Sequence, residues 1–193
     1  MNNTPDLMLM VINIGKIIPQ FIMLVQGTAG LTGLFFIGTS LLDFWLANSP
    51  GTEKHFAGSR TATNMGASTK LFVGGLFMSF ATLQLVGIMS RSITGDYVNS
   101  RALSYSAGGS SMEEQAQLAT LALLSIMQAV GACAFFRCLL TLNARGNGQQ
   151  NAGLSKVALW GIGAILAWNF KWFSDSVNNW VGFNVIALFT PWS

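Results

Sequence analysis

An uninterrupted apolar stretch constrains the fold of this chain more than any other feature. From Leu71 to Met89 there is no charged residue. A helix of that length spans about 30 Å, the thickness of the hydrocarbon core of a bilayer. The stretch also contains the adjacent glycines Gly74 and Gly75. Glycines destabilise a soluble helix, but in a membrane helix they let a neighbouring backbone approach closely. We therefore predict a transmembrane helix here.

The composition of the chain agrees with a membrane location. Of its 193 residues, 51% are hydrophobic and only 9% are charged, whereas soluble domains carry roughly 25% charged residues. So few charges cannot cover a soluble surface, and we expect lipid to surround much of the protein. The net charge of +3 comes from lysines and arginines that are dispersed along the chain. No direct binding of nucleic acid is expected from such a pattern.

Three further apolar stretches complete the predicted arrangement, at about 21–46, 118–142 and 155–173. We predict an all-α integral membrane protein with four transmembrane helices arranged as two tandem helical hairpins, and with interfacial helices at both ends. The predicted segments are an N-terminal interfacial segment (1–20), a first hairpin (21–89), a connecting loop (90–117), a second hairpin (118–173) and an interfacial C-terminal tail (174–193).

The two ends of the chain have alternative interpretations. Pro19 predicts that the first apolar helix stops or kinks before it and lies at the membrane interface. The alternative is that this segment spans the membrane. Near the other end, Trp180 and Trp192 favour an interfacial or partner-packed helix over a fifth span.

An internal repeat supports the two hairpins. Leu34-Phe35-Phe36 and Ala134-Phe135-Phe136 lie one hundred residues apart, and each precedes a polar loop, a Gly/Ser/Lys junction and a helix with closely spaced glycines. Such a repeat predicts two hairpins in one orientation, as in parallel-repeat membrane proteins. The alternative is a chance resemblance between apolar helices. Small residues on these helices are the predicted helix-packing positions, within one chain or between chains: Gly27, Gly30, Gly33, Gly74, Gly75, Gly161 and Gly163.

Loop charges predict the orientation in the membrane. An excess of Lys and Arg marks cytoplasmic loops, which favours hairpin loops in the cytoplasm and termini in the periplasm. The cations expected to contact lipid headgroups or the cytoplasm are Lys54, Arg60, Lys70, Arg145 and Lys156. A bound phospholipid is the one ligand expected.

Residue types needed for catalysis or metal binding are scarce. His55 is the only histidine, and Cys133 and Cys138 would lie on different faces of one helix. We therefore expect no enzymatic activity and no catalytic, cofactor-binding or metal-binding residues. Three polar residues near membrane helices are candidates for lining a pore: Gln84, Arg137 and Asn169. The alternatives are that the arginine reaches the interface and that the amides hydrogen-bond between helices.

Several stretches of the second half of the chain resemble a known family. They are the polar loop before Lys156, the Gly161/Gly163 helix, Ala167-Trp168-Asn169-Phe170 and Asn178-Asn179-Trp180-Val181-Gly182. In these residues the chain resembles the small inner-membrane proteins of type IVB (Dot/Icm) secretion systems, the IcmC/DotE and DotV family. Each predicted hairpin is also similar to the two-helix pilins of type IV secretion systems.

The resemblance implies a structural subunit of the bacterial inner membrane that supports export of effector proteins or DNA. It would pack around the translocation channel, in a homo- or hetero-oligomer with other secretion-system membrane subunits and with phospholipid. The alternatives are a small self-contained channel or transporter of two parallel hairpins, and a holin-like lysis protein.

Overall fold

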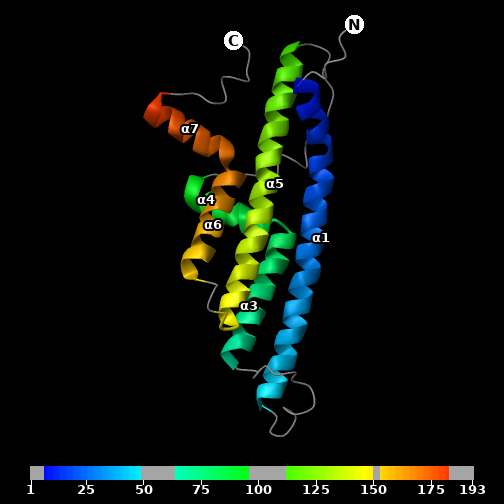
Figure 1. Cartoon of the computed structure of the whole chain (residues 1–193), viewed down its shortest axis with the longest axis vertical. Coiled ribbons are helices and arrows are strands. Elements are labelled where there is room, and N and C mark those ends of the chain that lie inside the picture. The colour runs from blue at the N-terminus through cyan, green and yellow to red at the C-terminus, as the bar shows by residue number, and fades with distance from the viewer. Residues whose placement is uncertain (1–6, 49–63, 96–111, 150–152, 183–193) are drawn as a thin grey trace. The chain divides into compact units, whose positions relative to one another are not determined.

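The structure, a computed structural model, describes residues 7–48, 64–95, 112–149 and 153–182. The regular secondary structure of these residues is α-helical, which confirms the predicted all-α class for this part of the chain (Figure 1). The helices are α1 (Leu7–Asn48), α3 (Asn64–Ala81), α4 (Gln84–Thr94), α5 (Met112–Gly146), α6 (Leu154–Trp168) and α7 (Phe170–Val181).

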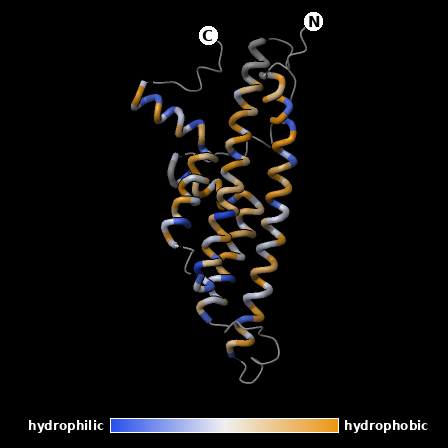
Figure 2. The backbone as a smooth tube through the Cα atoms, in the orientation of Figure 1, coloured by the Kyte–Doolittle hydropathy of each residue, from blue (hydrophilic) through white to orange (hydrophobic). Residues whose placement is uncertain are grey.

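Two of the described helices are long and apolar enough to cross a membrane. They are the stretch Leu9–Asn48 of α1 and the stretch Leu118–Gly146 of α5, along both of which hydrophobic residues predominate (Figure 2). Helices α3 and α4 make a third span if the bent pair is taken as one. Helix α6 is apolar but has only 15 residues, about 22 Å of helix. By length and composition, two or three spans therefore lie in the described part of the chain.

Helix α1 continues through the predicted N-terminal boundary. Pro19 lies inside α1, so the expected helix stop before Pro19 is wrong. A proline removes one backbone hydrogen bond from a helix interior. Apolar residues continue on both sides of it, and in an apolar solvent ending the helix would leave several more backbone groups unpaired. One missing bond is the smaller cost.

The stretch Leu71–Met89 was expected to form one transmembrane helix, but it is bent in the structure. Helix α3 ends at Ala81, and α4 begins at Gln84 after a bend of 91°. Leu83 between them has φ 57°, in the left-handed region, and its N–H donates to the carbonyl of Phe80 over 2.8 Å. A left-handed non-glycine residue costs roughly 1–2 kcal/mol. Because the turn contains neither Gly nor Pro, packing rather than local sequence imposes it.

The fourth predicted segment is interrupted as well. Helix α6 ends at Trp168, and Asn169 separates it from α7 with φ −101° and ψ 34°. The expected continuous helix over 155–173 is therefore wrong. Helix α7 ends at Gly182, whose φ of 73° is the left-handed geometry that glycine adopts without strain at a helix C-terminus. Residues 183–193 of the predicted tail lie outside the described residues.

The described helices form two compact units. Unit 1 consists of the described parts of Met1–Leu24, Gly87–Cys133 and Gly163–Ser193, and unit 2 consists of those of Val25–Val86 and Ala134–Ile162. Helices α1, α5 and α6 contribute residues to both units.

Neighbouring helices in unit 2 are antiparallel in the order α1, α3, α5, α6. Residue numbers rise on one helix as they fall on the next along each interface. Helix α1 therefore runs parallel to α5 and α3 parallel to α6, so the pairs α1–α3 and α5–α6 have one orientation, as the repeat predicts. The contacts are Gly33 with Gly74 and Ser40 with Ala67 (α1–α3), Thr69 with Gly146 and Phe80 with Phe135 (α3–α5), and Arg137 with Trp160 and Cys138 with Val157 (α5–α6).

Aromatic rings fill the centre of unit 2. Phe77 of α3 is fully buried and packs edge-on against Phe36 of α1 at 5.7 Å and against Phe136 of α5 at 5.0 Å between ring centroids. Such edge-to-face pairs add about 0.5–1.5 kcal/mol each beyond the area they bury. Phe36 and Phe136, which are equivalent positions of the repeat, thus pack against the same ring of α3.

The left-handed turn gives the first prediction. Replacing Leu83 by Gly relieves backbone strain and should raise the free energy of unfolding by about 1 kcal/mol. Unfolding in mixed detergent micelles, followed by circular dichroism, measures it. The control is Leu85→Gly inside α4, which should lower the same quantity by about 1 kcal/mol. Equal destabilisation by both variants would contradict a strained turn.

Candidate functional site

Two glycines allow the closest contact between α1 and α3. A Cβ atom added to Gly33 would lie 2.9 Å from the carbonyl oxygen of Gly74, and one added to Gly74 would lie 2.8 Å from Cγ1 of Ile37. Neither position can accept a side chain without moving the backbone of the partner helix. These two expected helix-packing residues therefore lie at the same contact.

The other expected glycines differ in their surroundings. A Cβ added to Gly30 or Gly161 would make ordinary contacts of 3.6 Å and 3.5 Å, with Ala81 Cβ and Cys138 Sγ. At Gly27, Gly75 and Gly163, no described atom lies within 4 Å of such a Cβ. These three leave room for a neighbour from outside the described part of the chain.

Two close-contact glycines were missed by the sequence reasoning. In unit 1, a Cβ on Gly131 of α5 would lie 2.9 Å from both the carbonyl oxygen of Ala164 and the backbone nitrogen of Trp168. In unit 2, Gly146 at the end of α5 lies against Thr69 of α3. The run of small residues that begins at Gly131 (Gly-Ala-Cys-Ala) could have indicated its close contact. A glycine at the end of an apolar helix, such as Gly146, is usually interpreted as a helix cap, so its sequence context did not indicate a contact.

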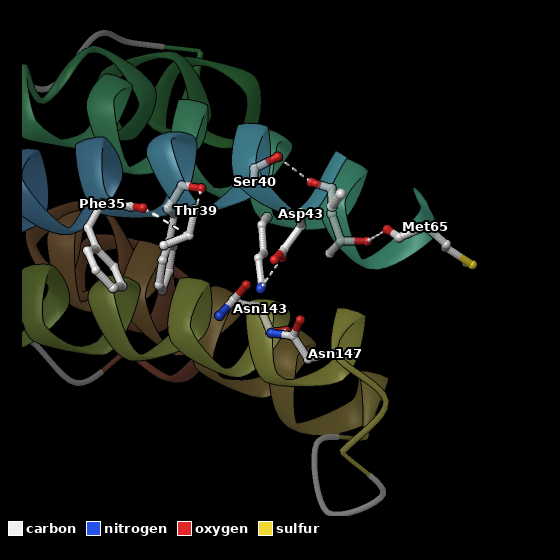
Figure 3. Close-up of polar contacts among 11 residues, drawn as sticks. Phe35, Thr39, Ser40, Asp43, Met65, Asn143 and Asn147 are labelled. Atoms are coloured by element: carbon white, nitrogen blue, oxygen red, sulfur yellow. Dashed lines mark hydrogen bonds and ion pairs between the residues drawn. The ribbon is translucent and has the colours of Figure 1, made fainter. Parts of the chain in front are cut away.

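Polar side chains link α1 to α3 near the loop end of unit 2 (Figure 3). The buried Ser40 donates its hydroxyl hydrogen to the carbonyl of Ala67 over 2.7 Å. One turn later Asp43 forms an ion pair with Lys70, both half-buried. Lys70 was expected to contact lipid headgroups, but its ammonium group is held by this carboxylate. Half-buried opposite charges attract each other more strongly than exposed ones because water and salt screen them less.

In unit 1 a buried hydrogen bond joins α4 to the break between α6 and α7. The hydroxyl of Ser90 donates to Oδ1 of Asn169 over 2.6 Å, and the amide of Asn169 donates to the carbonyl of Ile165 over 3.0 Å. The two side chains are 0% and 3% exposed. Asn169 thus makes a hydrogen bond between helices, the second of the two roles expected for it, and its break lets the amide reach both partners.

The remaining candidates for a pore lining have other surroundings. Gln84 is exposed at the start of α4. Arg137 is exposed on α5, with its guanidinium carbon 5.2 Å from the ring centroid of Trp160 on α6. Both belong to unit 2, whereas Asn169 is buried in unit 1.

The expected headgroup cations are only partly described. Arg145 and Lys156 are exposed, as a contact with lipid or water requires. Lys54 and Arg60 lie outside the described residues.

Among the described residues of unit 1, the further buried polar side chains are Gln128, Ser125 and Ser174, and no sequence pattern singled out the two serines. Ser125 donates to the carbonyl of Leu121 in its own helix, and Ser174 of α7 is buried with no partner for its hydroxyl oxygen among the described residues. In unit 2 the same holds for Oδ1 of Asn143, whose side chain Figure 3 draws on α5. A single serine in an apolar helix forms no recognisable spacing pattern in the sequence, so only the packing shows that it is buried.

Within the described ranges, no three His, Cys, Asp or Glu residues gather to hold a metal ion.

The glycine contact gives the second prediction. Gly33→Ala forces a Cβ against the backbone of α3 and should lower the free energy of unfolding by about 1–3 kcal/mol. Gly27→Ala on the same helix meets no described atom and should be neutral or stabilising by up to about 1 kcal/mol, because alanine favours helix. A mixed-micelle unfolding series on both proteins measures the difference; similar values would count against the close contact.

The hydrogen bond of Asn169 gives the third prediction. Asn169→Ala leaves the buried Ser90 without this acceptor and should lower the free energy of unfolding by about 1–3 kcal/mol. The matched control is Asn179→Ala on the exposed face of α7, which should change it by less than about 0.5 kcal/mol. Thermal unfolding in detergent compares the two, and an unaffected N169A protein would refute the role of this bond.

The chain matches no protein-family model, no curated protein and no solved structure.

Proposed function

We propose that this protein is a non-enzymatic structural subunit of the bacterial inner membrane, in a type IVB (Dot/Icm-like) secretion complex that exports effector proteins or DNA. Its partners are other membrane subunits of that complex and phospholipid. The family resemblance of the second half of the chain suggests the complex, and the helix packing supports a structural role within it.

One observation carries the structural role. Polar side chains from different elements are turned toward each other: Ser90 of α4 bonds Asn169 at the break between α6 and α7 in unit 1, and Asp43 of α1 pairs with Lys70 of α3 in unit 2. A solute path through a membrane needs polar groups that face water. Groups that satisfy one another instead fasten helices together. The arrangement thus favours a packing subunit over a self-contained transporter.

The outward surface of the helices supports assembly in a membrane. Large apolar side chains are exposed along α1 and α6, Leu31 (71%) and Leu159 (74%) among them. The unoccupied faces of Gly75 and Gly163 would admit helices of other subunits to close contact. We therefore place the contacts with neighbouring subunits on these faces.

We further propose four membrane crossings, by α1, α3, α5 and α6, in two parallel hairpins. Helix α3 has 18 residues, about 27 Å, and α6 about 22 Å; local thinning of the bilayer and snorkelling of Lys156 accommodate the shorter one. Helices α4 and α7, linked by Ser90 and Asn169, would then lie at the periplasmic interface. The hairpin loops face the cytoplasm and the termini the periplasm.

Affinity purification from the native membrane tests this proposal. The tagged protein, extracted in mild detergent, should recover other envelope subunits of the secretion system by mass spectrometry, while an unrelated tagged membrane protein should not. Gly163→Leu should reduce that recovery at least threefold and leave monomer stability unchanged, since the position is open in this chain. Recovery of the protein alone would contradict the proposal and favour a self-contained channel.

A further inference from the structure

Arg137 lies in an unusual place for a permanent charge. It belongs to the apolar stretch Leu118–Gly146 of α5, nine residues before the helix end, which is about 13 Å along the axis. Its side chain is exposed, and so are the apolar side chains nearby in unit 2, Leu140 (39%) and Leu159 (74%). A charge on such a surface is costly in lipid and usually has a partner or a function.

Trp160 accounts for one side of the guanidinium group. Its ring centroid lies 5.2 Å from the guanidinium carbon, a cation–π contact worth about 0.5–2 kcal/mol. A ring face attracts the charge but accepts none of the five N–H donors in the usual sense. No carboxylate among the described residues pairs with Arg137. The planar donor edge is therefore suited to an oxyanion from outside the chain.

Lys156 supplies a second cation beside the same ring. It lies four residues before Trp160 on α6, which places both side chains on one face of the helix, and it is exposed. Cys138 contacts Val157 across the antiparallel pair α5–α6. This register puts Lys156 about one turn, roughly 6 Å, nearer the loop end than the Arg137–Trp160 contact. Two flexible cations can therefore reach one anion over the tryptophan.

We propose that Arg137, Trp160 and Lys156 form a binding site for the phosphodiester group of an anionic phospholipid. The guanidinium donates two parallel hydrogen bonds to phosphate oxygens, as arginine does in bidentate anion binding, and the lysine adds a point charge. Trp160 lies six residues into α6, about 9 Å from its loop end, and the long side chains of Arg137 and Lys156 extend from this level toward the headgroups. The acyl chains cover the exposed leucines, which is why a lipid rather than free phosphate is the ligand.

This inference rests on the proposed membrane location but not on the proposed secretion complex. It reassigns Arg137 from a pore lining to the lipid surface, and it adds Arg137 and Trp160 to the expected headgroup contact of Lys156. The purified protein alone suffices to test it. A negative result would leave the purification test of the complex unaffected.

The experiment measures lipid binding by native mass spectrometry. The full chain in a non-ionic detergent is mixed with phosphatidylglycerol or with phosphatidylcholine. The wild-type protein should hold phosphatidylglycerol at least fivefold more than phosphatidylcholine. Arg137→Gln should reduce the bound phosphatidylglycerol at least fivefold, and Lys156→Gln at least twofold. The matched control Arg91→Gln, which removes an exposed arginine of α4, should change it by less than twofold.

Further arms make every outcome decisive. Excess inorganic phosphate should not displace the lipid; displacement would identify a free-phosphate site and overturn the lipid proposal. Equal losses in R137Q and R91Q would show a general charge effect and also overturn it. Arg137→Lys keeps the charge but not the planar fork, and should lose at least twofold. If circular dichroism shows that R137Q loses helix, R137K and K156Q decide the question instead.

Discussion

Helix association in an apolar solvent is the constraint on which this structure depends. Between helices surrounded by lipid there is no hydrophobic driving force, so contacts rely on close van der Waals packing and hydrogen bonds. In unit 2 the close approach comes from Gly33 against Gly74, beside the rings of Phe36, Phe77 and Phe136. In unit 1 it comes from Gly131 against the end of α6, together with the bond between Ser90 and Asn169. In both units, small residues let neighbouring helices approach closely, and polar contacts fix which residues of those helices face each other.

The same constraint separates polar residues by role. Those that find a partner within the chain, such as Asp43 with Lys70, hold helices in register. Those that remain on an apolar surface, such as Arg137 beside Trp160, point to a ligand outside the chain. Lipid phosphate is the chemistry that suits a cation whose long side chain can reach the headgroups from inside an apolar helix. In a membrane protein, internal bonds keep the helices in register, and charged surface groups help to set the depth of the helices in the bilayer.

The two helix breaks also follow from packing. The turn at Leu83 strains the backbone. At the turn at Asn169, the side-chain amide donates to the carbonyl of Ile165 and accepts a hydrogen bond from the hydroxyl of Ser90. Neither turn contains a Gly or Pro. Strained or unwound positions within apolar helices persist only where surrounding contacts over-determine them. Their local sequences are those of ordinary apolar helices, and the expected continuous helices over 71–89 and 155–173 were reasonable on that basis and wrong.

The sequence by itself determined the all-α class, the apolar character of α1 and α5, and the shared direction of the two halves, because hydropathy and repeat spacing act locally along the chain. It also identified the contact glycines Gly33 and Gly74, since small residues in apolar helices have few other uses. Only the tertiary structure decided where helices break, which glycines meet a neighbour, and that Lys70 has a carboxylate partner. These outcomes depend on residues far apart in the chain meeting in space, and one-dimensional spacing carries no information about which of several similar faces will meet.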